Sequence, residues 1–177
     1  MKKILKKRKD GIRQTYWTGN LEKLTTQNKY FRKVIYTSKN EQLVAMMIPV
    51  NGQIGNEVHK THDQFFRIEQ GTAKIIVKNK KHFILKAGGG LVINKGTYHN
   101  VINAGNKPLK LYTIYSPPNH PKGTIDKTRF DAILREKGIK PNEFTNLVRK
   151  INLDAPGAET ELFSLNTKGK NIHIKYP

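Results

Sequence analysis

The stretch NEVHKTHDQFFRIEQG, residues 56–71, places three polar residues just before an apolar strand that ends at a glycine. Glu57 and His59 are separated by one residue, and Gln64 follows five residues later. Residues two apart on an extended strand point to the same side, so the carboxylate and the imidazole share one face. The loop over residues 60–63 can return Gln64 to that face. The pattern fits a metal site, and it also fits a polar loop before a core strand.

The composition indicates one folded domain with a short appendage. The chain has 177 residues, of which 36% are hydrophobic. It contains no cysteine, which excludes disulfides, thiolate zinc sites and cysteine nucleophiles. The first residues are basic but lack the apolar run of a signal peptide, and no later stretch could span a bilayer. We therefore expect an intracellular, cytoplasmic protein.

Positive charge is concentrated near the N-terminus. The whole chain has 33 Lys and Arg against 13 Asp and Glu, and residues 1–40 alone hold 12 basic and 2 acidic residues. We expect residues 1–28 to form a basic arm that binds nucleic acid or another polyanion through phosphate contacts. The alternative is a solvated terminus without a partner. The basic residues are densest at Lys2, Lys3, Lys6, Lys7, Arg8 and Lys9.

Short apolar runs separated by turn residues follow one another from residue 43 to residue 116. Such spacing without intervening helices predicts an all-β fold of antiparallel strands over residues 29–120. Residues 121–177 are expected to form an extension. Apolar residues recur there at helical spacing near 128–137 and 141–150, and ETELFSL (159–165) and NIHIKY (171–176) are expected to be short strands.

A second polar motif, GGGLVINKGTYHNVIN, occupies residues 88–103. Its spacing is Gly-x5-Asn-x-Gly-x2-His-x3-Asn, set by Gly88, Asn94, Gly96, His99 and Asn103. Together with the first stretch it resembles the two motifs of the cupin superfamily, in which a proline usually stands at the position of Asn94. The resemblance implies an antiparallel double-stranded β-helix, or jelly-roll barrel. Over about residues 30–128 the chain is similar to small single-domain cupins described as mannose-6-phosphate-isomerase-like. Cupins often pair through their sheets, so the resemblance implies a homodimer.

The same resemblance implies a metal site at Glu57, His59, Gln64 and His99. The usual cupin site has three histidines and one carboxylate, so the acid has moved here and an amide stands where an acid is expected. Carboxylate, imidazole and amide ligands together suit divalent Mn, Fe, Ni or Zn. His62 is an alternative ligand. The alternative to the whole site is a hydrogen-bonded cluster without a metal.

Two functions remain open from the sequence. The first is binding of a small molecule, such as a sugar or sugar phosphate, with isomerase-like or dioxygenase-like chemistry at the metal. Tyr112 and Arg67 are candidates to contact that molecule. No catalytic residue is assigned, because Glu57 could act either as a ligand or as a general base. The second is a non-enzymatic structural or packaging protein, a virion or nucleoprotein component that binds polyanions through its arm.

Overall fold

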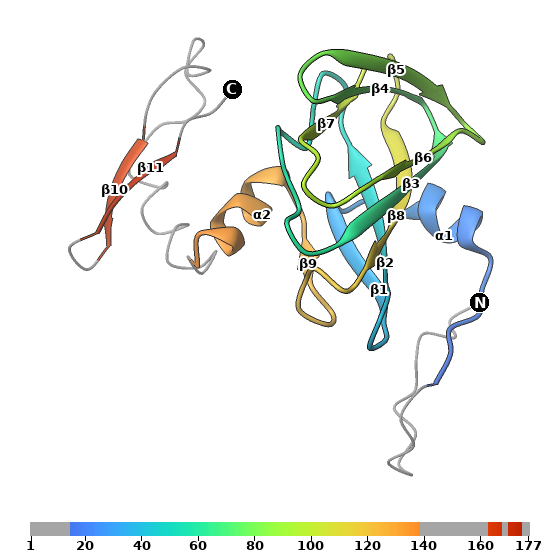
Figure 1. The fold of residues 1–177 in the computed structure, drawn as a ribbon, viewed down its shortest axis with the longest axis horizontal. Helices are drawn as coiled ribbons and strands as arrows, with labels where there is room; N and C mark the ends of the chain where they lie inside the picture. Colours follow the sequence, from blue (N-terminus) through green and yellow to red (C-terminus); the bar gives the residue numbers. More distant parts are fainter. Residues whose placement is uncertain (1–14, 139–162, 168–169, 175–177) are drawn as a thin grey trace.

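The computed structural model describes residues 15–138, 163–167 and 170–174 (Figure 1). The described chain is built mainly of antiparallel strands, and no helix interrupts residues 64–115, as the sequence predicted. One sheet has six strands, in the order β6 (Gly90–Ile93), β3 (Asp63–Gln70), β8 (Leu109–Ser116), β2 (Gln42–Ile48), β1 (Arg32–Thr37) and β9 (Ile125–Asp126). A second sheet has three, in the order β5 (Lys81–Lys86), β4 (Thr72–Val77) and β7 (His99–Asn103). This is the predicted antiparallel jelly-roll fold.

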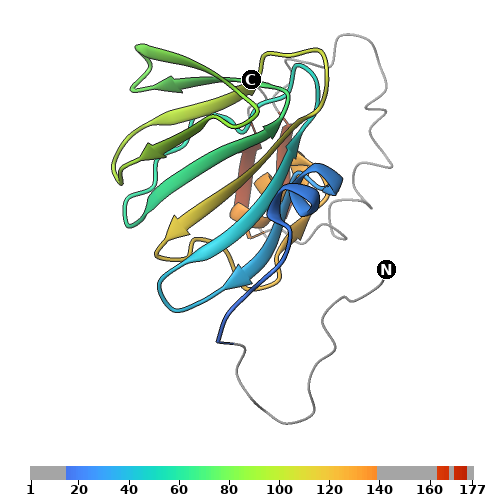
Figure 2. The same ribbon diagram turned by 90° about the vertical axis from the view of Figure 1, so that its right-hand side faces the viewer.

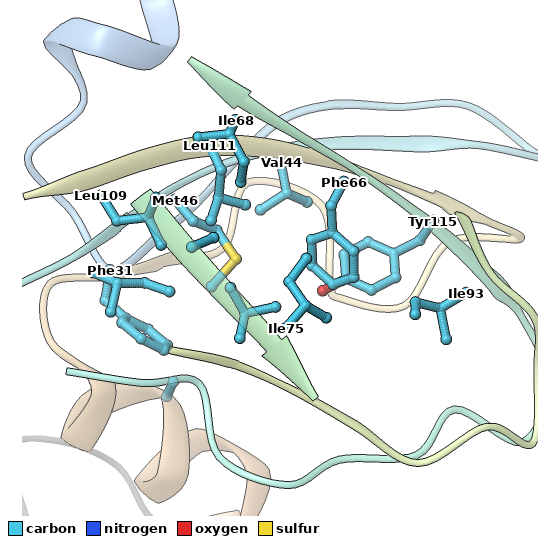
Figure 3. Packing of buried hydrophobic residues seen from close by; sticks show 14 of the residues in the cluster. Phe31, Val44, Met46, Phe66, Ile68, Ile75, Ile93, Leu109, Leu111 and Tyr115 are labelled. Atoms are coloured by element: carbon cyan, nitrogen blue, oxygen red, sulfur yellow. The ribbon is translucent and has the colours of Figure 1, made fainter. Parts of the chain in front are cut away.

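The hydrophobic core lies between the two sheets because the strands alternate inward and outward residues. On β3, Phe66 and Ile68 are fully buried, whereas Phe65 and Arg67, which alternate with them, remain partly exposed. On β4, Ala73 and Ile75 are buried in the same way. Side chains from both sheets and from the loops between them fill this core (Figure 3), including Val44, Met46, Ile48, Phe66, Ile68, Ile75, Val101 and Leu111.

A short helix, α1 (Leu21–Gln27), packs against β8, β3 and β2 of the six-stranded sheet (Figure 2). The sequence did not predict this helix, because residues 1–28 were assigned to the basic arm. Its N-terminus is capped by the Asn20 side chain, which accepts a hydrogen bond of 2.7 Å from the backbone N–H of Lys23. Behind it, the buried Lys110 donates from Nζ to the carbonyl oxygen of Asn28. Residues 21–28 thus contact the barrel directly.

The helix α2 (Arg129–Glu136) lies within the predicted range 128–137. Its N-terminus carries a capping box formed by Thr128 and Asp131. The other helix predicted for the extension, at 141–150, lies outside the described residues. The predicted C-terminal strands are present as β10 (Phe163–Thr167) and β11 (Lys170–Ile174), which pair with each other. In the described part of the chain, no helix has the length and hydrophobicity needed to cross a membrane.

A buried ion network joins α2 to the barrel. Asp126 on β9 is fully buried and accepts hydrogen bonds from Arg32 on β1 (3.4 Å) and from Arg135 on α2 (2.6 Å). Arg32 also donates to Glu136, at 3.0 Å. Buried charges persist only when they are paired and hydrogen-bonded, and this arrangement meets that requirement at the junction between helix and sheet.

Candidate metal centre

The structure brings together the four polar residues that the sequence singled out. Glu57 and His59 lie in the connection that precedes β3, and Gln64 is the second residue of β3. His99 is the first residue of β7, in the opposite sheet. Glu57 and His99 form an isolated antiparallel bridge, in which each backbone N–H donates to the other residue's carbonyl at 2.9 Å. This bridge places the two side chains next to each other.

The side-chain donor atoms of the group converge. One carboxylate oxygen of Glu57, Oε1, lies 3.3 Å from Nε2 of His59 and 3.3 Å from Nε2 of His99. The potential ligand atoms of these three residues all lie within 4.8 Å of one another. Gln64 joins them from the other sheet, with its Oε1 3.1 Å from Nε2 of His99. The cluster therefore spans the space between the two sheets.

The orientation of His99 suits a metal ligand. Its Nδ1 lies 3.0 Å from the carbonyl oxygen of Thr97, which can only accept, so Nδ1 carries the proton. In the neutral ring, Nε2 then presents a lone pair toward the oxygens of Glu57 and Gln64. Three electron-rich atoms facing one another in this way provide the ligand atoms that a cation would bind. A backbone carbonyl that fixes the tautomer of a ligating histidine is the usual outer partner in metal sites.

The electrostatics of Glu57 favour its ionised form. Burial alone would raise its pKa, but hydrogen bonds with His59 and His99, and the charges that these rings can carry, lower the pKa to about 2. A cation bound between the three residues would supply positive charge in place of protonated rings and would hold the carboxylate in its ionised form. One anionic oxygen and two neutral nitrogens form a donor set that fits a divalent cation.

The two segments that carry the cluster are fastened to each other at several points. Gly96 donates its backbone N–H to the carbonyl of His59 at 2.7 Å, and Lys95 donates to Oδ1 of Asp63 at 2.8 Å. Asn100, next to His99, accepts from the backbone N–H of Gly55 at 3.0 Å. It also donates from Nδ2 to Oε1 of Gln53 at 2.6 Å. The loop that leads to Glu57 is thus bound to the strand that carries His99.

Aromatic rings border the cluster on one side. The ring of His62 lies 4.4 Å from that of His59, and both rings meet Tyr115 edge-on at 5.4–5.5 Å. The ring of His120 also meets Tyr115 edge-on, with the ring centroids 5.1 Å apart. Burial and the nearby positive charge of Arg32 lower the pKa of His120 to about 3, so this ring is neutral at physiological pH. Burial likewise raises the pKa of Tyr115, which keeps its hydroxyl protonated.

Other sequence candidates lie apart from this cluster. Arg67 and Tyr112 are directly paired on β3 and β8, in register positions that alternate with the buried Phe66 and Leu111. Their side chains therefore lie on the outer face of the six-stranded sheet, and Arg67 pairs with Glu69 at 3.6 Å. The structure does not bring them to the barrel interior, where a molecule bound beside the cluster would lie. The basic residues at 2–9 lie outside the described residues, so polyanion binding stays a prediction.

Sequence reasoning missed two contributors to the site. Asn100 follows His99 directly, but its bonds to Gln53 and Gly55 depend on how the loop meets β7. His120 is the second, because its ring packs on Tyr115. The SPPNHP sequence around His120 has no periodic pattern of apolar residues that would predict a buried ring.

The fold and the cluster together define a double-sheet barrel with a candidate metal centre between its sheets. The family description "Cupin domain" matches residues 44–115. The YrkC protein of Bacillus subtilis is 43% identical over 122 residues, which are 66% of this chain and 66% of that protein. The L612 protein of Acanthamoeba polyphaga mimivirus is 44% identical over 131 residues, 72% of this chain and 80% of that protein.

Two solved structures are similar to this chain in fold. The crystal structure of BH2720 from Bacillus halodurans has a TM-score of 0.66 and 36% identity, and the match covers 70% of this chain and 96% of that one. That of TT1209 from Thermus thermophilus has a TM-score of 0.51 at 19% identity, which shows a shared fold, over 56% of this chain and 96% of that one. The chain belongs to the cupin family.

Proposed function

We propose that this protein is a cupin that binds a divalent metal ion through Glu57, His59 and His99, with Gln64 as a fourth ligand, and holds a small molecule beside the ion. The observation that carries the proposal is the position of Glu57 Oε1, which lies 3.3 Å from Nε2 of His59 and 3.3 Å from Nε2 of His99. Two histidines and one carboxylate with free coordination positions are typical of non-haem Fe(II) sites, and the same donors accept Mn, Ni or Zn.

The chain's own residues account for positioning and for exclusion of water. The carbonyl of Thr97 holds His99 with Nε2 turned toward Glu57 and Gln64. Phe66, fully buried, meets the ring of His99 at 5.7 Å and closes that side of the site with an apolar surface. A bound ion would polarise an oxygen of the small molecule. Glu57 contacts both imidazoles, so in this proposal it acts as a ligand and is not available as a general base.

The proposal is tested by metal analysis and calorimetric titration of the purified protein with Mn²⁺, Fe²⁺, Ni²⁺ and Zn²⁺. We expect one ion per chain, with occupancy falling in acid, because an imidazole binds a metal only in its neutral form. Glu57→Ala and His59→Ala should lose the ion and keep the circular dichroism spectrum of the folded barrel. His82→Ala, on the exposed strand β5, is the matched control. Equal metal content in all four proteins would refute the proposal.

A further inference from the structure

Two buried polar atoms beside the metal cluster have no hydrogen-bond partner among the described residues. They are Nε2 of Gln64 and Nε2 of His62. Gln64 is 1% exposed and His62 is 6% exposed, so water does not readily satisfy either group. A buried polar atom without a partner lowers stability, so each such atom calls for an explanation, such as a functional role or a bound ion.

Both atoms can donate a hydrogen bond. With Oε1 of Gln64 turned toward His99 at 3.1 Å, its Nε2 carries two hydrogens that find no acceptor. Nδ1 of His62 lies 3.2 Å from the hydroxyl oxygen of Thr61. When that hydroxyl donates to Nδ1, the ring hydrogen resides on Nε2. The side of the site lined by these two nitrogens therefore presents donors that lack an acceptor.

The charge of the loaded site favours a negative ligand. A divalent ion together with the carboxylate of Glu57 and two neutral imidazoles leaves a net charge of about +1, since each imidazole binds a metal in its neutral form. The nearby Arg32 is already paired with Asp126 and Glu136. In a partly dehydrated interior, such a positive centre attracts anions more strongly than it would in water.

We propose that the barrel binds a small oxyanion, a carboxylate or a phosphate group, next to the metal, with His62 and Gln64 as hydrogen-bond donors to its oxygens. The inference rests on the proposed metal site and adds the class of molecule that this site takes. His62 lies outside the group of converging ligand atoms, yet its ring is 4.4 Å from that of His59. It is therefore placed to contact a molecule bound at the ion without holding the ion itself.

The test begins with the metal-loaded wild-type protein and two probes, acetate and inorganic phosphate, titrated by calorimetry. Binding of either probe is expected, and the tighter one identifies the class of oxyanion. His62→Phe should keep its metal affinity and bind the probe about ten- to a hundredfold more weakly, because a hydrogen bond to a charged group is lost. Without the probe, His62→Phe should melt at a higher temperature than wild type, because the unpartnered nitrogen is gone. His82→Phe, an exposed histidine on β5, should change neither affinity.

His62→Gln keeps an amide donor and should retain most of the probe affinity, which guards against a folding defect in His62→Phe. In the wild type, the side-chain N–H resonances of Gln64 and His62 should shift in the NMR spectrum when the probe is added. A wild-type protein that binds no metal would refute the proposed function. A protein that binds metal but neither probe, or a His62→Phe variant with unchanged probe affinity, would refute only the oxyanion site.

Discussion

Replacing Asn100 with alanine should loosen the metal centre without touching any ligand. The substitution removes the bond that Asn100 accepts from the backbone N–H of Gly55 at 3.0 Å and the bond that it donates to Gln53 at 2.6 Å. Each is worth about 0.5–1.5 kcal/mol net, so the free energy of unfolding should fall by about 1–3 kcal/mol. Because the freed loop carries Glu57, metal affinity should fall about 10–100-fold, as it does when outer partners of ligands are removed.

The assay combines metal titration with denaturant unfolding in the presence of a chelator, which separates metal affinity from stability. Asn100→Asp keeps the acceptor for Gly55 but loses the donor to Gln53, and we expect an intermediate affinity. Asn106→Ala, at an exposed position in the loop before β8, should alter neither quantity. If Asn100→Ala lost stability yet bound metal as tightly as wild type, the idea that this side chain positions Glu57 would be wrong.

Three further predictions concern charge. Gln64→Glu should bind metal about tenfold more tightly or better. Without metal the variant should be less stable than wild type, because a second buried carboxylate repels Glu57 when no cation is present. Unchanged metal affinity would show that Gln64 is not a ligand. The lowered pKa of His120, about 3 against an ordinary 6.5, keeps the native ring neutral while the unfolded chain takes up a proton. The contribution of His120 to the free energy of unfolding is thus present above pH 6.5 and is lost as the pH falls toward 3. Between pH 7 and pH 5 this loss is at most about 2 kcal/mol. His120→Gln should therefore make stability, measured by denaturant unfolding with chelator, less dependent on pH in this range. Finally, Asp126→Asn should lower the free energy of unfolding, measured by chemical denaturation, by about 3 kcal/mol, because Arg32 stays buried and only partly paired. The side chain of Glu136 is 57% exposed, so Glu136→Gln should lower it by less than about 1 kcal/mol. Equal losses in the two variants would contradict the greater importance of the buried pair.

The sequence predicted the barrel because alternation and turn residues are local signals. Phe66 and Ile68 had to face inward once β3 was recognised, and the glycine at 71 ended the strand as expected. The spacing of Glu57, His59, Gln64 and His99 predicted their convergence through resemblance to known motifs. What brings them together physically is the pairing of Glu57 with His99 across separate segments, which no local pattern contains.

Features that depend on long-range contacts were not predictable in this way. The helix α1 has only seven residues, too few to be stable alone, and it forms against β8, β3 and β2. Arg67 and Tyr112 were candidates for ligand contact, but the register of β3 with β8 places both on the outer face of the sheet. The burial of His62 likewise follows from how the loop folds over Tyr115.

The separation of the ligands along the chain has a consequence for folding. Glu57 and His59 precede β3, whereas His99 begins β7, so the cluster exists only after the two sheets have closed on each other. Closing such distant segments costs loop entropy before their contacts form, so we expect this closure to come late in folding. An ion bound there would therefore stabilise contacts that the folding transition state has not yet formed. Its effect should appear as slower unfolding of the native barrel, with the rate of folding left nearly unchanged.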